Sequence, residues 1–149
     1  MKKIIFLDIF GVLATPKSGA NLDEDCFAKL LEILRKTKAS IVLTTSFRRS
    51  ESFLSRFKKG LQDEGICQSC VFDATPDLKH IEKWNSNEEL RAKEIQKYIE
   101  ENDVKNYVII DDMDLKPYLE DEININFVRC ETHIGLTNER ADKCFEVLK

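Results

Sequence analysis

Short apolar runs alternate with stretches of helical periodicity along this chain. The runs show no internal alternation of apolar and polar residues, which is typical of strands buried on both faces of a sheet. Regular strand-then-helix order implies a parallel sheet whose strands are joined by right-handed crossovers. We therefore expect an α/β fold, a three-layer sandwich around a central parallel sheet of about five strands. The predicted strands are residues 4–7, 39–45, 70–72, 107–110 and 125–128.

The predicted helices lie between these runs, where apolar residues recur three, four and seven positions apart. Asp23 is placed to cap the first helix. The second helix is expected to stop near Gly60 or Gly65, and residues 73–87, with Pro76, are the one candidate for a substantial loop. The apolar faces are Phe27, Leu30, Leu31 and Leu34; Phe53, Leu54, Phe57 and Leu61; Ala92, Ile95, Tyr98 and Ile99, in a helix over about 88–101; and Ala141, Cys144, Phe145 and Leu148.

Composition narrows the function classes. The 149 residues are 42% hydrophobic, which is enough for one domain over residues 1–149 with a real core. The net charge of −4 gives no global basic field, so any contact with nucleic acid has to come from a local patch. Asp8 interrupts the apolar N-terminus too early for a signal peptide, and no run approaches transmembrane length. Five scattered cysteines argue against a secreted disulfide scaffold, so we expect a cytoplasmic protein.

Polar side chains follow three of the strands directly. Asp8 ends the first run, Thr45 ends the second, and Asp111 and Asp112 end the fourth. The carboxyl ends of parallel strands meet at one edge of a sheet, where α/β proteins bind ligands, so these side chains should converge. Carboxylates this close repel one another unless a cation joins them, and hard oxygen ligands suit Mg²⁺. The simpler alternative is that each polar residue merely ends its strand.

The order of these motifs resembles the haloacid dehalogenase (HAD) superfamily, whose phosphatases carry Asp-x-Asp-Gly after the first strand. Within it, the chain is similar to the small capless HAD domain associated with Swiss-army-knife RNA repair proteins, itself similar to polynucleotide phosphatases. The resemblance implies a Rossmann-like fold without a cap domain and a Mg²⁺-dependent hydrolase. The matching segments, of which the first and fourth are specific and the last is weak alone, are residues 6–13, 41–48, 91–95, 108–112 and 135–137.

The resemblance also implies roles for the residues that do the chemistry. Asp8 is expected to be the nucleophile, forming an aspartyl-phosphate that water then hydrolyses. Thr45 fits the position of the phosphate-binding hydroxyl best, with Thr44 and Ser46 as alternatives.

Basic and metal-binding positions follow from the same resemblance. Either Arg91 or Lys93 is expected to neutralise the charge of Asp8 and the phosphoryl group. Arg48 either clamps phosphate or the substrate backbone, or is solvated at the start of a helix. The expected Mg²⁺ ligands are Asp8, the main-chain carbonyl of Phe10, and at least one of Asp111 and Asp112.

Phe10 departs from the pattern of the family. HAD phosphatases carry Asp there as general acid for the leaving group and then general base for water, and phenylalanine can do neither. Loss of such proton transfer typically costs about 10²–10⁴-fold in rate. Three interpretations are open: an impaired or binding-only relative, a drifted or engineered variant of an active phosphatase, or metal-free dehalogenase chemistry, for which Tyr or Phe is common at this position. The acidic pair at 111–112 argues against the last, and we favour phosphatase ancestry with turnover in question.

Two cysteine-containing pairs suggest a second kind of site. Cys67-x-x-Cys70 and Cys130-x-x-His133 together have the composition of a structural zinc site. The long gap between the pairs favours the other interpretation, in which Cys70 packs in its strand and the remaining residues are incidental.

The expected loops are short. Neither the loop after the first strand nor residues 73–87 can hold a cap domain, so the site should lie open. An open site suits a phosphorylated macromolecular end, such as the 3′ end of RNA or DNA, better than a small metabolite. His80 and Trp84 can contact a base or sugar, although a solvated histidine and a tryptophan covering the core are the simpler interpretation. The rival class is a non-enzymatic phosphate-binding or interaction module.

Overall fold

A single parallel sheet forms the centre of the protein. The structure, a computed structural model, describes residues 2–148, apart from the side chain of Phe72. Five strands pair in the order β3-β2-β1-β4-β5, and every pairing is parallel. This confirms the predicted α/β class and its central five-stranded sheet. The strands are β1 (Lys3–Leu7), β2 (Ser40–Leu43), β3 (Val71–Ala74), β4 (Asn106–Asp111) and β5 (Phe127–Arg129).

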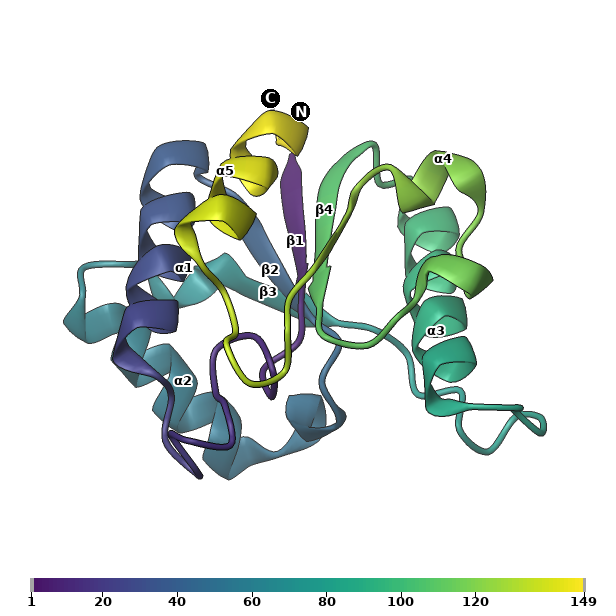
Figure 1. Ribbon diagram of the computed structural model, residues 1–149, viewed down its shortest axis with the longest axis horizontal. Coiled ribbons are helices and arrows are strands. Elements are labelled where there is room, and N and C mark those ends of the chain that lie inside the picture. Colours follow the sequence, from purple (N-terminus) through teal and green to yellow (C-terminus); the bar gives the residue numbers. More distant parts are fainter. Residues whose placement is uncertain (1, 149) are drawn as a thin grey trace.

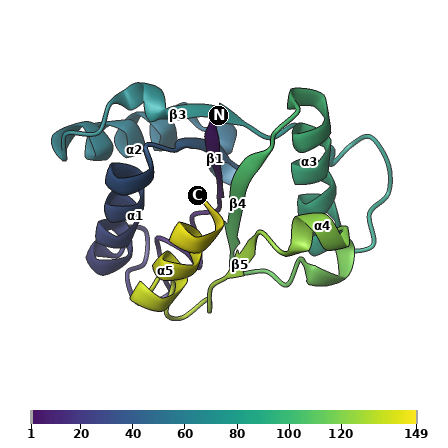
Figure 2. The same cartoon turned by 90° about the horizontal axis from the view of Figure 1, so that it is seen from above.

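Helices cover both faces of the sheet (Figures 1 and 2). The first, second and fifth helices lie over one face and the third and fourth lie over the other, which gives three layers. They are α1 (Glu24–Thr37), α2 (Glu51–Asp63), α3 (Asn87–Asn102), α4 (Asp121–Asn124) and α5 (Asn138–Val147), with 3₁₀ turns η1 (Ser46–Arg49), η2 (Gln68–Cys70) and η3 (Lys116–Tyr118). No helix of the described chain is long and apolar enough to cross a membrane.

Burial on both faces explains why the strands read as unbroken apolar runs. In β1, Ile5 and Leu7 pack into the core beneath the first, second and fifth helices. Ile4 and Phe6 point the other way, into the core beneath the third helix. Successive side chains of a strand face opposite sides, so a strand covered twice needs apolar residues at every position.

Several element boundaries differ from the predicted ones. β5 begins at Phe127, because Ile125 caps the end of the short α4 and is 77% exposed. β2 ends at Leu43, before the two threonines. α2 runs through Gly60 and ends at Asp63, two residues before Gly65, which confirms the second of the two predicted stops. The predicted cap on the first helix is confirmed, since the side chain of Asp23 accepts a hydrogen bond from the amide of Cys26.

One edge of the sheet carries the loops that hold most of the predicted site residues. Leu7 pairs with Leu43 on one side and with Ile110 on the other, so the residues that follow these three emerge at the same level. In Figure 1 these loops meet at the bottom of the view, together with the loop after β5. We call this the carboxyl edge. In the described residues its connections are short, and no cap domain covers it.

Candidate active site

Three carboxylates meet at the carboxyl edge. Asp8 follows β1 directly, Asp111 is the last residue of β4, and Asp112 comes next. One ligand oxygen from each lies within 4.8 Å of the other two. Asp8 and Asp111 are buried, whereas Asp112 is partly exposed. The predicted convergence of these side chains therefore exists in the fold.

Arg91 is the cation beside these carboxylates. It lies in the first turns of α3, and its Nη1 is 2.7 Å from Asp111 Oδ2 and 3.3 Å from Asp8 Oδ1. Lys93, the other basic residue considered for this role, is exposed on the outer side of the same helix. The geometry therefore separates two residues that sequence spacing left equivalent.

The electrostatic balance of the cluster is negative. Burial, followed by repulsion from Asp111, raises the pKa of Asp8 well above its ordinary value, although Arg91 opposes the shift. Burial raises the pKa of Asp111 as well. Burial lowers the pKa of Arg91, but attraction to Asp111 and Asp8 more than reverses this and leaves it raised. One guanidinium thus does not neutralise three carboxylates, and the charge of the cluster favours the binding of a further cation.

The residues fit Mg²⁺ in chemistry as well as charge. Hard carboxylate oxygens from three side chains are the ligands that Mg²⁺ takes, commonly one or two of them together with water and phosphate oxygens. Asp111 also accepts a hydrogen bond from the amide of Met113, which orients its carboxylate. Asp8, Asp111 and Asp112 are therefore the side chains able to hold the ion.

Two contacts fix the third carboxylate. Thr132, in the loop after β5, donates a hydrogen bond of 2.8 Å to Asp112 Oδ2. Gly11, with a φ of +87°, leaves the space that the carboxyl group of Asp112 occupies. A Cβ on residue 11 would collide with that carboxyl group. Neither contact could be read from the sequence, because the partner of Asp112 lies 20 residues away in an irregular loop.

Three hydroxyl residues follow β2. Thr45 is buried, and its Oγ1 accepts a hydrogen bond from the amide of Phe47. This bond caps the start of η1, and because the hydroxyl is the acceptor, its own proton can be donated to a ligand. Among the described side chains, Thr44 Oγ1 is a buried polar atom without a hydrogen-bond partner. Ser46 is exposed and lines a cavity of about 380 Å³ together with Arg91.

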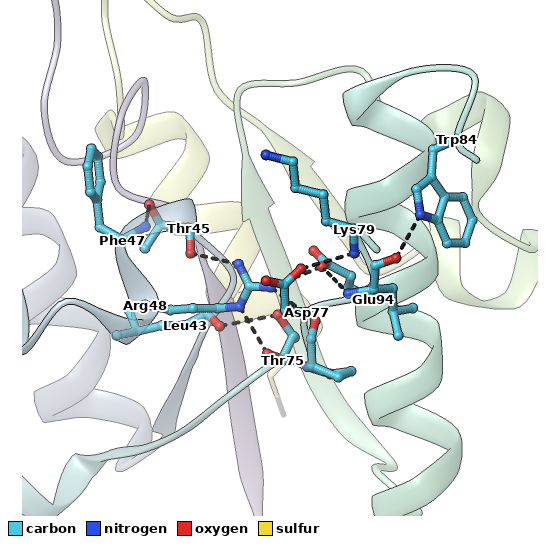
Figure 3. Close-up of polar contacts among 11 residues, drawn as sticks. Leu43, Thr45, Phe47, Arg48, Thr75, Asp77, Lys79, Trp84 and Glu94 are labelled. Atoms are coloured by element: carbon cyan, nitrogen blue, oxygen red, sulfur yellow. Dashed lines mark hydrogen bonds and ion pairs between the residues drawn. The ribbon is translucent and has the colours of Figure 1, made fainter. Parts of the chain in front are cut away.

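Arg48 is not solvated, so that expectation for it is wrong. It lines the same cavity as Ser46 and Arg91, so a contact with phosphate stays a prediction. It is buried, and its guanidinium donates to the carbonyls of Thr45, Thr75 and Pro76. It also forms an ion pair of 2.9 Å with Glu94, which is equally buried (Figure 3). These partners consume most of the five donors of the side chain.

The Arg48–Glu94 pair fastens three parts of the carboxyl edge together. Glu94 lies on α3 one turn beyond Arg91, and its carboxylate also accepts a hydrogen bond from the amide of Leu78. Trp84 donates its indole N–H to the carbonyl of Leu78, which anchors the far end of this loop (Figure 3). Burial raises the pKa of Glu94 despite the hydrogen bond from Leu78 and the attraction of Arg48.

Lys79 is a site residue that the sequence did not single out. It lines the same cavity as Ser46 and Arg91, and its side chain extends past the Arg48–Glu94 pair towards the side where Thr45 and Phe47 lie (Figure 3). A lysine within a polar loop carries no signal of this position. His80, next to it, is exposed.

The cysteine pairs do not form a zinc site. Cys67 and Cys70 precede β3, at one end of the strand order, whereas Cys130 and His133 follow β5 at the other end. The described residues contain one cluster suited to a metal, and it is the group of three aspartates. Cys130 is buried in the core, and burial raises its thiol pKa to about 12.

Comparison with known proteins supplies the family. Residues 4–141 match the family described as the HAD domain in Swiss Army Knife RNA repair proteins. No curated protein and no solved structure matches the chain. The matched region covers the sheet apart from Lys3 and includes Asp8, Arg91, Asp111 and Asp112. The chain therefore belongs to the family of HAD domains found in Swiss Army Knife RNA repair proteins.

Proposed function

We propose that this protein is a Mg²⁺-dependent, HAD-type phosphatase that acts through an aspartyl-phosphate on a phosphorylated nucleic-acid end. The observation that carries the proposal is the placement of Asp8, Asp111 and Asp112 around Arg91 at the carboxyl edge. Membership in a HAD family supports hydrolysis of a phosphate ester as the reaction class.

Two steps account for the reaction. A carboxylate oxygen of Asp8 attacks the phosphorus atom, the bond from phosphorus to the leaving oxygen breaks, and that oxygen takes a proton from solvent. Water then attacks the aspartyl-phosphate and releases inorganic phosphate and the free carboxylate of Asp8. Arg91 offsets the negative charge of Asp8 and of the phosphoryl oxygens in both steps, and Thr45 or Ser46 donates a hydrogen bond to a phosphoryl oxygen.

Asp8, Asp111, Asp112 and the carbonyl of Phe10 would hold Mg²⁺, which when bound supplies charge stabilisation at the phosphoryl oxygens. Arg91 alone leaves the cluster negative, so a dianionic phosphate is repelled until a further cation is present.

Phe10 makes both proton transfers slow. Its ring is 48% exposed and offers no group that donates or accepts a proton. An activated aryl ester, whose leaving group needs no proton, is therefore the substrate on which transfer to Asp8 is easiest to detect. Hydrolysis of the aspartyl-phosphate becomes the slow step, because no side chain at position 10 activates water.

The test restores the missing group. We expect Phe10→Asp to raise the turnover of an aryl phosphate by roughly 10²-fold or more, the usual effect of a positioned acid and base. Asp8→Asn in the Phe10→Asp background should abolish turnover, and so should chelation of Mg²⁺. Ile134→Asp, which places a carboxylate at another exposed apolar position of a loop at the same edge, is the matched control and should give no gain.

Steady-state kinetics on these variants decide between two functions. If Phe10→Asp folds, binds Mg²⁺ and gains nothing, the phosphatase proposal loses its main support. The second candidate, a phosphate-binding module without turnover, is favoured by Phe10 itself. It predicts that wild-type protein retains a phosphorylated oligonucleotide with Mg²⁺ over long incubation without releasing phosphate.

The proposal also includes a macromolecular substrate, because the site is open. The described loops at the carboxyl edge are short and no cap domain encloses the site, so a strand end reaches Asp8 without a closing motion. Small metabolites depend on enclosure for affinity, which this edge offers only in part.

A further inference from the structure

Two aromatic rings stand exposed at the carboxyl edge. Phe10 is 48% and Phe47 is 54% exposed, and no other aromatic side chain that the structure describes is a large exposed hydrophobic. Phe10 lies in the loop after β1 and Phe47 in the turn after β2, and these two strands are neighbours in register. Both rings therefore flank the strand ends that carry Asp8 and Thr45.

Hydrogen bonds hold the backbone at Phe10 and Phe47 in place. Phe47 lies in η1, whose first turn is closed by the hydroxyl of Thr45. Its ring lies 6.2 Å from that of Phe53, which in turn stacks at 5.7 Å on the buried ring of Phe57, so a row of rings connects the surface to the core. The turn after β1 is closed by hydrogen bonds from Gly11 to Ala14 and from Leu13 to Ile9.

The side chains near Phe47 indicate what kind of ligand would bind against these rings. Ser46, next to Phe47, lines a cavity of about 380 Å³ that also contains Arg91 and Lys79. Figure 3 shows Phe47 and Lys79 on the same side of the Arg48–Glu94 pair, with the ring of Phe47 turned away from that pair. Asp77 and Glu94 also line this cavity. An exposed aromatic ring next to a cavity lined by a lysine and an arginine suits a ligand that joins a phosphate to an aromatic face, as a nucleotide does.

We propose that Phe10 and Phe47 form a stacking platform for an unpaired base of the substrate strand, while Lys79 contacts a phosphate of that strand. The proposal rests on the proposed function, because it takes the phosphorylated end to lie at Asp8. Stacking tolerates any base, since every base has a π-face, so the platform binds strand ends without reading their sequence. The fixed row of rings lowers the entropy lost on binding.

Binding, not turnover, tests the platform. The probe is a single-stranded oligonucleotide whose terminal phosphate is replaced by a non-hydrolysable phosphonate, titrated into the full chain with Mg²⁺, and inorganic phosphate is titrated in parallel. Base–aromatic stacking contributes enough that we expect Phe47→Ala to weaken oligonucleotide binding roughly 5- to 100-fold. Phe47→Trp should restore it, and Phe47→Leu, which is apolar but not flat, should not.

Ile125→Ala is the matched control. Ile125 is more exposed than either ring, but it precedes β5 and so lies at the opposite edge of the sheet. It should leave the affinity for the oligonucleotide unchanged. An equal loss of affinity for the oligonucleotide and for inorganic phosphate in Phe47→Ala would mean a structural role and overturn the proposal. So would unchanged oligonucleotide binding in the Phe10→Ala, Phe47→Ala double variant.

Two further outcomes separate this proposal from others. A phosphotyrosine peptide that binds as tightly as the oligonucleotide, with the same dependence on Phe47, would overturn the assignment to a nucleic-acid strand. A wild-type chain that binds the phosphonate probe through Phe47, but never releases phosphate from the matching phosphorylated oligonucleotide, would support the platform and contradict the phosphatase. The two proposals therefore fail by different measurements.

Discussion

Gly11 shows how one residue without a side chain shapes the cluster of three aspartates. Its φ of +87° lies in the left-handed region, and its missing Cβ makes room for the carboxyl group of Asp112. We expect Gly11→Ala to push Asp112 away from its hydrogen bond with Thr132. Displacing a supporting contact of this kind typically weakens metal binding by about 10–100-fold, measurable by calorimetric titration of Mg²⁺.

Gly19→Ala separates the collision from the backbone strain. Gly19 has a φ of +66°, but nothing lies within 4 Å of where its Cβ would be. Both variants should lose about 1–2 kcal/mol of stability from the left-handed conformation. Only Gly11→Ala should lose Mg²⁺ affinity, and equal affinities in the two variants would contradict the role given to Gly11.

Among the elements, the Arg48–Glu94 pair joins η1, the loop after β3 and α3. Arg48→Met would remove the ion-pair partner of Glu94 and the donor to the carbonyls of Thr75 and Pro76, whereas the carbonyl of Thr45 keeps its bond from the amide of residue 48. Breaking a buried pair in this way costs about 3–5 kcal/mol, which denaturant unfolding would measure. Glu94→Gln should cost less, because Arg48 keeps its carbonyl partners and the amide oxygen still accepts from Leu78.

The single tryptophan gives this prediction a local measurement. Trp84 is bonded to the loop that Arg48 fastens, so Arg48→Met should also change its fluorescence in the folded state. Lys59→Met removes one partner of an exposed ion pair on α2 and is the control. Its effect should stay within about 0.5 kcal/mol. Arg48→Met with a similar effect would mean that the buried pair does not hold these elements together.

For the molecule as a whole, local signals predicted the fold and part of the site. The apolar runs and the acidic residues after β1 and β4 are visible in the sequence, because burial on two faces and a strand end each leave a local pattern. Apart from the nearby carbonyl of Thr45, the partners of Arg48 lie 27 to 46 residues away, so no local pattern could distinguish a buried arginine from a solvated one. The orientation of Arg91 against Lys93 likewise depended on how α3 packs.

The charge cluster also predicts how the stability of the whole chain responds to pH and Mg²⁺. The pKa values of Asp8 and Asp111 are raised in the folded protein. At pH values between the ordinary carboxyl pKa and these raised values, the folded state therefore holds protons that the unfolded chain has already released. This contribution is present below the ordinary carboxyl pKa of 3.8 and is lost as pH rises through the raised values. Without metal, the wild type should therefore lose stability towards neutral pH, and Asp8→Asn should lose less.

Mg²⁺ should reverse that loss, and more strongly at pH 7.5 than at pH 5, because protons compete for the same oxygens at low pH. At about 100 times the dissociation constant, bound Mg²⁺ adds roughly 2.7 kcal/mol, which corresponds to about 5–10 °C in Tm for a chain of this size. Thermal unfolding in Mg²⁺ and in chelator at both pH values measures this. Asp114→Asn, which changes an exposed carboxylate outside the cluster, should respond like the wild type. An equal Mg²⁺ shift at pH 5 and pH 7.5, or a full shift in Asp8→Asn, would show that the ion binds elsewhere.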